Sequence, residues 1–233
     1  MTGMRDYWDE RAREDAFYFV DNRINYKDPA EAERFWEMGR VDLDRVLDAA
    51  DVQIAADDVV VEIGCGVGRL TRVIAERAAT VKALDVSAEM LALAREQNAA
   101  LTNVEWIHGD GVSLAGIDDA VADAVVSHVV FQHIPDPQIT LGYVREIGRV
   151  LKPGGVTAVH MSNDKAVHDW KPTLRDRVRT LLGRGPKGQT HEAWMGSAVD
   201  VDDLRAAAAD GGMELEKLVG EGTQYMIVRL RRT

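Results

Sequence analysis

The stretch Val59-Val-Val-Glu-Ile-Gly-Cys-Gly-Val-Gly-Arg-Leu70 joins an apolar run to a glycine-rich turn and then to the start of a helix. The apolar run predicts a buried strand. Glycines at positions 64, 66 and 68 allow the backbone to turn sharply and to approach a ligand closely, because glycine has no Cβ atom. The helix that begins near Arg69 presents free backbone N–H groups at its first turn. The stretch therefore predicts a site for a nucleoside-type cofactor.

Glycine spacing and charge favour one kind of cofactor over another. The dinucleotide pattern Gly-x-Gly-x-x-Gly is not met, because Arg69 stands where the third glycine is required. Glu62 would repel a pyrophosphate, whereas S-adenosylmethionine carries no phosphate and offers an ammonium, a sulfonium and ribose hydroxyls. Asp85 ends the next predicted strand, where an acid can accept hydrogen bonds from both ribose hydroxyls. These features favour S-adenosylmethionine.

Several motifs follow one another in an order that resembles the class I S-adenosylmethionine-dependent methyltransferases, from about Val59 to His160. The resemblance implies that the glycine turn holds the methionine part of the cofactor. It also implies that Asp85 binds the ribose and that Asp110, after the third strand, takes the adenine amino group. The segment Ala122–Asp136 resembles the part of the family that lines the reaction centre, and Arg149–Gly155 resembles the lead into strand five.

The cofactor site implied by this resemblance is assembled from the glycine turn and the ends of four strands. Taken singly, Asp85 is equally compatible with a helix cap before Ser87, and Asp110 with a turn residue. Cys65 is the only cysteine, which excludes an intrachain disulfide and suggests a small buried filler in the turn. The predicted cofactor residues are Glu62, Gly64, Cys65, Gly66, Gly68, Asp85, Val86, Met90, Asp110, Gly111, His128 and Val129.

Strands and helices alternate after the glycine turn, which is typical of an α/β fold with a parallel sheet. Helices are expected at 69–78, 87–100 and 139–151, the last one stopped by a Lys-Pro-Gly-Gly sequence. Two strands at 213–219 and 224–231 are separated by a glycine-containing turn and predict a hairpin. The resemblance implies a Rossmann-like sheet of seven strands, mostly parallel with the last antiparallel, and helices on both faces.

The chain is expected to form an N-terminal helical cap (1–50) and a cofactor-binding methyltransferase domain (51–233). Amphipathic patterns predict helices at 7–20 and 29–50. An insertion at 163–196 interrupts the alternation after strand five and predicts a substrate lid. It carries a basic group that either attracts an acidic acceptor or forms a solvated face: Lys165, Lys171, Arg175, Arg177, Arg179, Arg184 and Lys187.

Aromatic residues of the cap and of the insertion are candidates for closing the site over the acceptor. In methyltransferases that the chain resembles, N-terminal helices fold over the cofactor and substrate. Each aromatic taken alone is equally explained by packing against the flank of the sheet. The predicted substrate-binding residues are Tyr7, Trp8, Tyr18, Trp36, His133, Trp170 and Trp194.

Methyl transfer from a sulfonium is an in-line displacement, so positioning of the acceptor and exclusion of water dominate the catalytic task. An oxygen acceptor must also lose a proton, and histidine is the usual base near neutral pH. His133 is the first candidate base, followed by His128 and His160. His133 alternatively only fixes the turn that follows it, and an amine acceptor needs no dedicated base.

Composition limits the partners. The chain of 233 residues has 28 basic and 39 acidic side chains, a formal net charge of −11, which opposes binding to nucleic acid. No apolar run approaches the ~20 residues of a membrane span, and the start of the sequence lacks the apolar core of a secretory signal. We therefore expect a cytoplasmic protein. No metal site is expected, because His128 and His133 have no nearby cysteine pair. The oligomeric state is left open.

Three functions are compatible with these features. The first is transfer of a methyl group from S-adenosylmethionine to an oxygen or nitrogen of a small molecule, a secondary metabolite or cofactor precursor, which leaves S-adenosylhomocysteine. The second is a non-catalytic S-adenosylmethionine-binding protein. The third is a nicotinamide-dependent oxidoreductase, which the glycine spacing and Glu62 disfavour.

Overall fold

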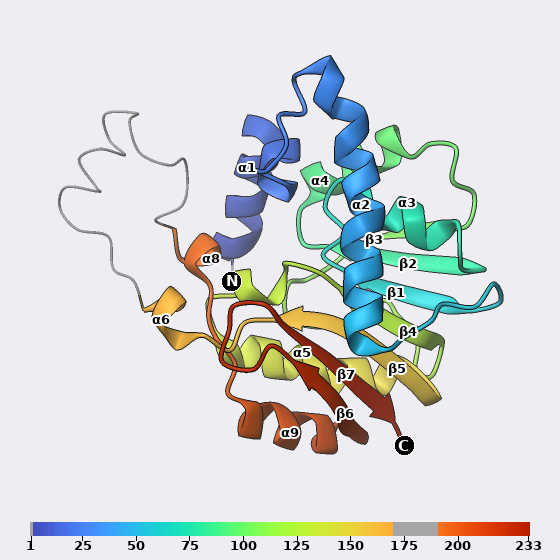
Figure 1. Cartoon of the computed structure of the whole chain (residues 1–233), viewed down its shortest axis with the longest axis vertical. Coiled ribbons are helices and arrows are strands. Elements are labelled where there is room, and N and C mark those ends of the chain that lie inside the picture. The colour runs from blue at the N-terminus through green and yellow to red at the C-terminus, as the bar shows by residue number, and fades with distance from the viewer. Residues whose placement is uncertain (1, 170–190) are drawn as a thin grey trace.

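The computed structural model of this chain describes residues 2–169 and 191–233 (Figure 1). Within these ranges, one sheet has the strand order β3-β2-β1-β4-β5-β7-β6. All neighbouring pairs from β3 to β5 are parallel, and β7 runs antiparallel to both β5 and β6. The predicted sheet of seven strands with the last one reversed is confirmed. Its strands are β1 (Val59–Ile63), β2 (Thr80–Asp85), β3 (Val104–His108), β4 (Ala122–Ser127), β5 (Leu151–Met161), β6 (Met213–Val219) and β7 (Met226–Arg232).

Helices cover both faces of the sheet (Figure 1). One apolar cluster joins α5 and α9 to the sheet, and a second joins α2 and α3 to its other face. Val60 and Val61 belong to different clusters, because neighbouring side chains of a strand point to opposite faces. The helices of the described residues are α1 (Thr2–Val20), α2 (Pro29–Ala50), α3 (Arg69–Ala75), α4 (Ala88–Gln97), the 3₁₀ turn η1 (Phe131–His133), α5 (Pro137–Val150), α6 (Lys165–His168), α8 (Glu192–Met195) and α9 (Val201–Asp210).

Helix α2 has the predicted bounds, whereas α1 begins earlier than predicted and contains a break. Asp28 caps α2 by accepting from the backbone N–H of Ala30, and Pro29 occupies the first turn. In α1, Asp15 has φ −169° and ψ 77°, so the chain is extended there for one residue. This break turns the last residues of α1 toward the carboxyl end of the sheet, where Phe19 and Val20 line a cleft.

Three other helix boundaries differ from those predicted. Helix α3 ends at Ala75, because the N–H groups of Arg77 and Ala78 both bond to the carbonyl of Ile74 and close a turn. Helix α4 begins after Ser87, whose side chain accepts from Met90 N, and ends at Gln97. Helix α5 starts at Pro137, and β5 follows it directly at Leu151. The sequence predicted to stop α5, residues 152–155, is thus part of a strand.

The N-terminal region is not uniformly a cap. Leu43, Val46 and Leu47 of α2 pack in the same cluster as Val60 of β1, so α2 belongs to the core of the sheet domain. Helix α1 instead lies across the carboxyl ends of the strands (Figure 1). The domain boundary after residue 50 stays a prediction. Of the predicted lid, residues 170–190 lie outside the described part, including Trp170 and the basic residues from Lys171 to Lys187. Among the helices described, none is both long and apolar enough to cross a bilayer.

The glycine turn depends on Gly64 for steric reasons. Gly64 has φ +76°, and a Cβ atom there would lie 2.3 Å from Val130 Cγ2. We expect Gly64→Ala to lower the free energy of unfolding by about 3 kcal/mol, since left-handed strain adds to overpacking. Gly154→Ala is the matched control, because Gly154 has φ +83° but nothing within 4 Å of the added Cβ. It should cost roughly 1–2 kcal/mol. Urea denaturation measures both, and equal losses would contradict the contact with Val130.

Candidate active site

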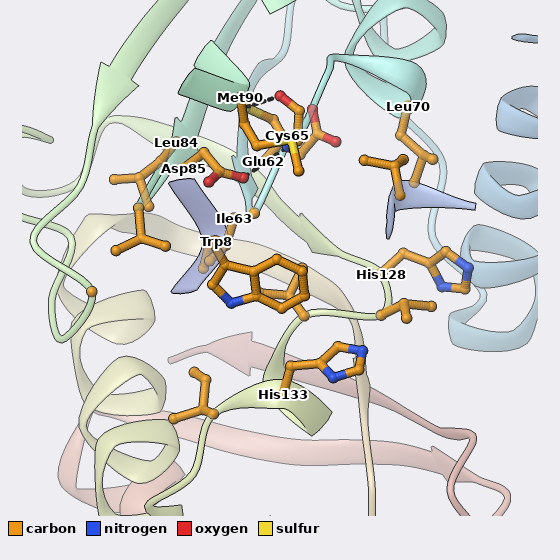
Figure 2. Close-up of a pocket in the computed structure, with 18 of the residues that line it drawn as sticks. Trp8, Glu62, Ile63, Cys65, Leu70, Leu84, Asp85, Met90, His128 and His133 are labelled. Atoms are coloured by element: carbon orange, nitrogen blue, oxygen red, sulfur yellow. Dashed lines mark hydrogen bonds between the residues drawn. The ribbon is translucent and has the colours of Figure 1, made fainter. Parts of the chain in front are cut away.

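A cleft lies where β1, β2 and β4 end, the carboxyl edge of the parallel sheet (Figure 2). Its empty space is about 1050 Å³ with the open mouth included. The glycine turn and α1 supply much of its wall. The lining residues are Met4, Trp8, Phe19, Val20, Glu62, Ile63, Gly64, Cys65, Gly66, Arg69, Leu70, Leu84, Asp85, Val86, Met90, Gly111, His128, Val129, Val130, His133, Ile134 and Tyr143.

Most of the predicted cofactor residues line this cleft, and two do not. Gly68 lies behind it, where a Cβ atom would come within 2.5 Å of Asn98 Nδ2. Asp110 also lies outside the lining. The ten that line it are Glu62, Gly64, Cys65, Gly66, Asp85, Val86, Met90, Gly111, His128 and Val129.

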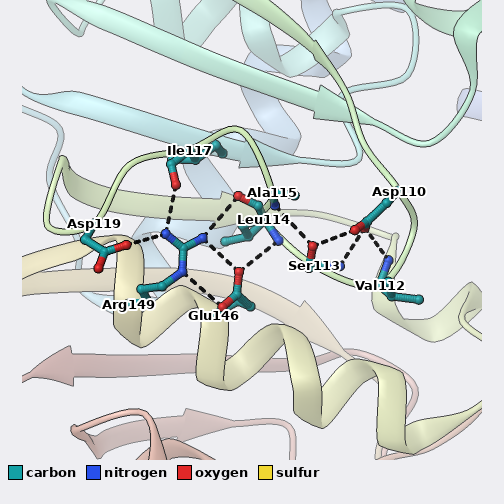
Figure 3. A network of polar contacts seen from close by, with 9 residues as sticks. All are labelled: Asp110, Val112, Ser113, Leu114, Ala115, Ile117, Asp119, Glu146 and Arg149. Carbon is teal, nitrogen blue, oxygen red and sulfur yellow. Dashed lines mark hydrogen bonds and ion pairs between the residues drawn. The ribbon is translucent and has the colours of Figure 1, made fainter.

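Asp110 is engaged by its own loop (Figure 3). Its carboxylate accepts from the N–H groups of Val112 and Ser113, each at 2.8 Å, and from the Ser113 hydroxyl at 2.6 Å. Partial burial acts to raise the pKa of Asp110, but these hydrogen bonds outweigh it and lower that pKa. Arg149 of α5 ties the end of the same loop to that helix by donating to the Ile117 carbonyl and to Asp119. The geometry matches the turn-residue interpretation of Asp110, and its role toward adenine stays a prediction.

Asp85 connects the glycine turn to the start of α4. One carboxylate oxygen accepts from Gly66 N and the other from Ser87 N, both at 2.8 Å. The helix cap itself is Ser87. Asp85 is 8% exposed, and burial raises its pKa even though both hydrogen bonds act against the rise. Each oxygen has acceptor capacity left for a ligand in the cleft.

Glu62 is a buried acid of the cleft with a strongly raised pKa. The Thr71 hydroxyl donates to its carboxylate at 2.5 Å, and the residue is 4% exposed. Burial raises the pKa of Glu62 to about 7, opposed by the Thr71 hydrogen bond and assisted by the negative charge of Asp85. A cation bound beside Glu62 would restore its ionised form.

Arg69 enters the cleft from the first turn of α3. Its guanidinium bonds to Asp42 of α2 at 2.8 Å and lies 3.5 Å from Asp21, while its Nε atom is buried without a partner. His128 Nδ1 is also buried without a partner. Both residues line the cleft. Arg69 Nε is a donor that suits an anionic ligand group, whereas the free His128 Nδ1 can donate or accept according to its tautomer.

Trp8 is the one predicted aromatic of α1 that lines the cleft, and it lies edge-on to His133 with ring centroids 5.6 Å apart. Tyr7 is buried behind it and stacks on His191 at 4.3 Å. Trp194 packs against His133 at 5.1 Å, outside the lining itself. The described C-terminal end of the predicted lid therefore contacts α1 and η1.

The other predicted aromatics of the two N-terminal helices lie away from the cleft. Trp36 packs against Phe17 and carries the guanidinium of Arg72 over its ring at 3.8 Å. Tyr18 is 38% exposed on the outer side of α1. Packing between helices explains Trp36, and a surface position explains Tyr18.

The three candidate histidines have different environments. Both ring nitrogens of His133 are engaged, Nδ1 with the Trp194 carbonyl at 2.9 Å and Nε2 with the Gln132 amide at 3.2 Å. Both nitrogens of His160 are also engaged, and His160 does not line the cleft. Burial lowers the pKa of His128 and of His133 to about 4, so both rings are neutral at physiological pH. His128 alone of the three lines the cleft with a ring nitrogen that has no partner.

Lining residues that the sequence did not single out include Phe19, Val20, Arg69 and Tyr143. For Arg69 a signal existed, because a cation directly after a glycine turn starts a helix that faces the ligand. Within the described residues, no three His, Cys, Asp or Glu side chains are grouped so as to hold a metal ion.

Comparisons with known proteins agree on one family. A sequence profile described as a methyltransferase domain matches residues 61–159. The chain is 39% identical over 113 residues to a trans-aconitate 2-methyltransferase of Azoarcus sp., covering 47% of this chain and 42% of that protein. It is 32% identical to a malonyl-[acyl-carrier protein] O-methyltransferase of Marinomonas sp., covering 72% of this chain and 58% of that protein.

Residues 61–159 carry a methyltransferase domain, and the similarities support a class I S-adenosylmethionine-dependent methyltransferase. Its fold is shared by the N-methyltransferase NodS of Bradyrhizobium japonicum, whose structure contains S-adenosylhomocysteine. The TM-score is 0.61 at 14% identity, covering 99% of this chain and 98% of NodS. The chain spans about half the length of the curated relatives that it matches most strongly.

The chemistry of the cleft fits the cofactor of this family, S-adenosylmethionine. Two buried carboxylates, Glu62 and Asp85, suit a ligand that carries cationic groups and hydroxyl donors. The unpartnered Arg69 Nε suits its carboxylate. The glycine turn leaves space that a Cβ atom would fill.

Proposed function

We propose that this chain transfers the methyl group of S-adenosylmethionine to an oxygen or nitrogen of a small-molecule acceptor. The observation that carries the proposal is a single cleft with Glu62 and Asp85 at one end and His128, His133 and Trp8 at the other (Figure 2). In such a cleft the cofactor site lies directly beside an uncharged, partly aromatic chamber for the acceptor.

In this proposal, the glycine turn and its neighbours hold the cofactor. Glu62 faces its cationic groups, Asp85 accepts from the ribose hydroxyls, and Arg69 Nε donates to the carboxylate. When bound, the cofactor supplies a methyl group on a sulfonium, which is already activated for displacement. The chain's own task is to position the acceptor and to keep water out.

The acceptor end is formed by α1 and by the segment after β4. Trp8 and Phe19 shield it from solvent, and His128 receives the proton of a hydroxyl acceptor through its free ring nitrogen. In this proposal His133, the first candidate base, is a positioning residue that holds the wall in place, which its hydrogen bonds to Trp194 and Gln132 support.

The nature of the acceptor is supported by the relatives. They include enzymes named for trans-aconitate, for malonyl-[acyl-carrier protein] and for ubiquinone biosynthesis, and two of these three names specify a small organic molecule or its precursor. An acidic acceptor stays a prediction, because most of the basic segment that suggested it lies outside the described residues.

Calorimetric titration of the purified protein with S-adenosylmethionine, S-adenosylhomocysteine and NADH tests the cofactor assignment first. We expect both adenosyl compounds to bind, and Asp85→Ala to weaken them about tenfold or more, since a hydrogen bond to a charged group contributes roughly 1.5–3 kcal/mol. Asp118→Ala is the control, because Asp118 is exposed and does not line the cleft.

Incubation with S-adenosylmethionine and a panel of small acids, phenols and amines then tests catalysis. Methylated product together with S-adenosylhomocysteine is the expected result. Tight binding without turnover on the whole panel would favour the non-catalytic alternative, and binding of NADH alone would contradict the cofactor assignment.

A further inference from the structure

Val129 has an unusual backbone conformation at the wall of the cleft. Three non-glycine residues of the described chain have positive φ, and Val129, at +57°, is the one with a β-branched side chain. Left-handed backbone is unfavourable for valine, because Cβ and its two methyl groups crowd the carbonyl. Such a conformation persists only where the surroundings hold it, and it concentrates at functional sites.

The side chain that holds Val129 is His160, at the end of β5. The Val129 N–H donates to His160 Nδ1 at 3.1 Å, and His160 Nε2 donates to the carbonyl of Gln224 at 3.0 Å. A carbonyl oxygen only accepts, so the second bond fixes which ring nitrogen carries the proton. His160 is 1% exposed, and Tyr225 stacks on its ring with centroids 5.7 Å apart. The turn between β6 and β7 thus orients the ring.

The left-handed turn at Val129 determines where the next residues lie. Val130 packs against the glycine turn, at the point where a Cβ atom on Gly64 would clash with it. The 3₁₀ turn η1 follows at once, with His133 N donating to the Val130 carbonyl at 2.9 Å. His128, Val129, Val130 and His133 all line the cleft. A relaxed conformation at Val129 would redirect this whole wall.

We propose that His160 is a positioning residue, which holds Val129 in the left-handed conformation and so shapes the cleft wall between His128 and His133. The inference rests on the proposed function, because in that proposal this part of the cleft wall contacts both the cofactor and the acceptor. His160 does not line the cleft, so its effect passes through the Val129 N–H. The buried histidine, predicted as a candidate base, thereby has a different role.

A double-mutant cycle between positions 160 and 129 tests this role by binding alone, with no acceptor needed. His160→Phe keeps a ring that can stack on Tyr225 but removes the acceptor for Val129 N–H. We expect it to weaken S-adenosylhomocysteine about tenfold in calorimetry. His160→Gln offers an acceptor and a donor again, and should recover most of the affinity.

The Val129→Gly background separates positioning from general structural support. Glycine adopts positive φ without strain, so in this background His160→Phe should change the affinity by less than about twofold relative to Val129→Gly alone. Equal losses from His160→Phe in both backgrounds would overturn the inference. His160→Gln replaces His160→Phe in the cycle if the phenylalanine variant does not fold.

The outcomes for this inference and for the proposed function are distinct. A wild-type protein that binds S-adenosylhomocysteine and shows the expected cycle, but methylates nothing, contradicts the proposed function and leaves the role of His160 standing. Methyl transfer combined with equal losses in both backgrounds contradicts the role of His160 alone.

Discussion

Replacing Glu62 by glutamine is expected to weaken S-adenosylmethionine about a hundredfold at pH 8 and, at the same time, to stabilise the free protein. In the free protein the carboxyl is buried against Thr71 and Asp85, and burial raises its pKa to about 7. A cationic ligand favours the ionised form, and glutamine offers no charge to match it. The same buried charge is therefore unfavourable before binding and favourable after it.

The sign of the stability effect follows from the proton balance. The folded protein holds a proton on Glu62 up to about pH 7, whereas the unfolded chain loses it near the ordinary value of 4.5. Between these values the folded state binds more protons, so the free energy of unfolding falls as pH rises. Above pH 7 the full cost of roughly 3 kcal/mol is present, and Glu62→Gln removes it. Below about pH 4.5 the variant and the wild type should be equally stable.

Affinity for S-adenosylmethionine should show the complementary pH dependence. Below pH 7 a proton must leave Glu62 on binding, so the affinity of the wild type should fall about tenfold per pH unit. Calorimetry in two buffers of different ionisation enthalpy counts the released proton. Glu105→Gln is the matched control, because Glu105 lies exposed on β3 and pairs with Lys82. An affinity that does not change from pH 5.5 to 8 would show that Glu62 keeps its charge without the ligand.

The sequence predicts best those parts of the site that are local in the chain. The glycine turn requires consecutive positive φ values at Gly64, Gly66 and Gly68, and Asp85 stands at the end of the next strand. Helix α2 has the bounds that the sequence predicts, since Asp28 and Pro29 mark its start by local chemistry. Each of these signals depends on residues within a few positions of one another.

The features of the site that the sequence did not predict depend mainly on tertiary contacts. His133 loses its free nitrogens to Gln132 and to the carbonyl of Trp194, which lies 61 residues away. Phe19 lines the cleft beyond a break in α1 at Asp15, a polar position within an otherwise helical pattern. Asp110 turns to its own Ser113, although the same residue type at the same strand end was equally compatible with a ligand contact. Such choices depend on tertiary packing, which periodicity does not encode.

Arg69 is the clearest case, because its partners lie far earlier in the chain: Asp42 in α2 and Asp21 directly after α1. Asp42 is 0% exposed and Asp21 5%, and both carboxylates are shared between Arg69 and Arg23. Burial acts to raise the pKa of both aspartates, but the hydrogen bonds from Arg23, and for Asp42 also from Arg69, lower it. The group is thus an ionised network that joins the end of α1, α2 and α3 directly beside the cleft.

Arg69→Met is expected to lower the free energy of unfolding by about 3–5 kcal/mol, because it leaves Asp42 buried with less compensation. Arg40→Met is the matched control. Arg40 pairs with Glu76 on the surface, with side chains 50% and 47% exposed, and such a pair contributes about 0–1 kcal/mol. Urea denaturation followed by circular dichroism gives both values.

Adding Asp42→Asn to Arg69→Met separates the cost of an unpaired charge from the value of the ion pair. Because the asparagine carries no charge, the double variant should be less destabilised than the sum of the two single variants, by about 1–3 kcal/mol. Strict additivity would contradict the direct pairing of Arg69 with Asp42. The double variant should still bind S-adenosylhomocysteine less tightly than the wild type, because the unpartnered Nε of Arg69, a residue that lines the cleft, is missing in it. Recovery of stability without recovery of affinity would thus assign Arg69 two separable roles, one in the fold and one in binding the cofactor.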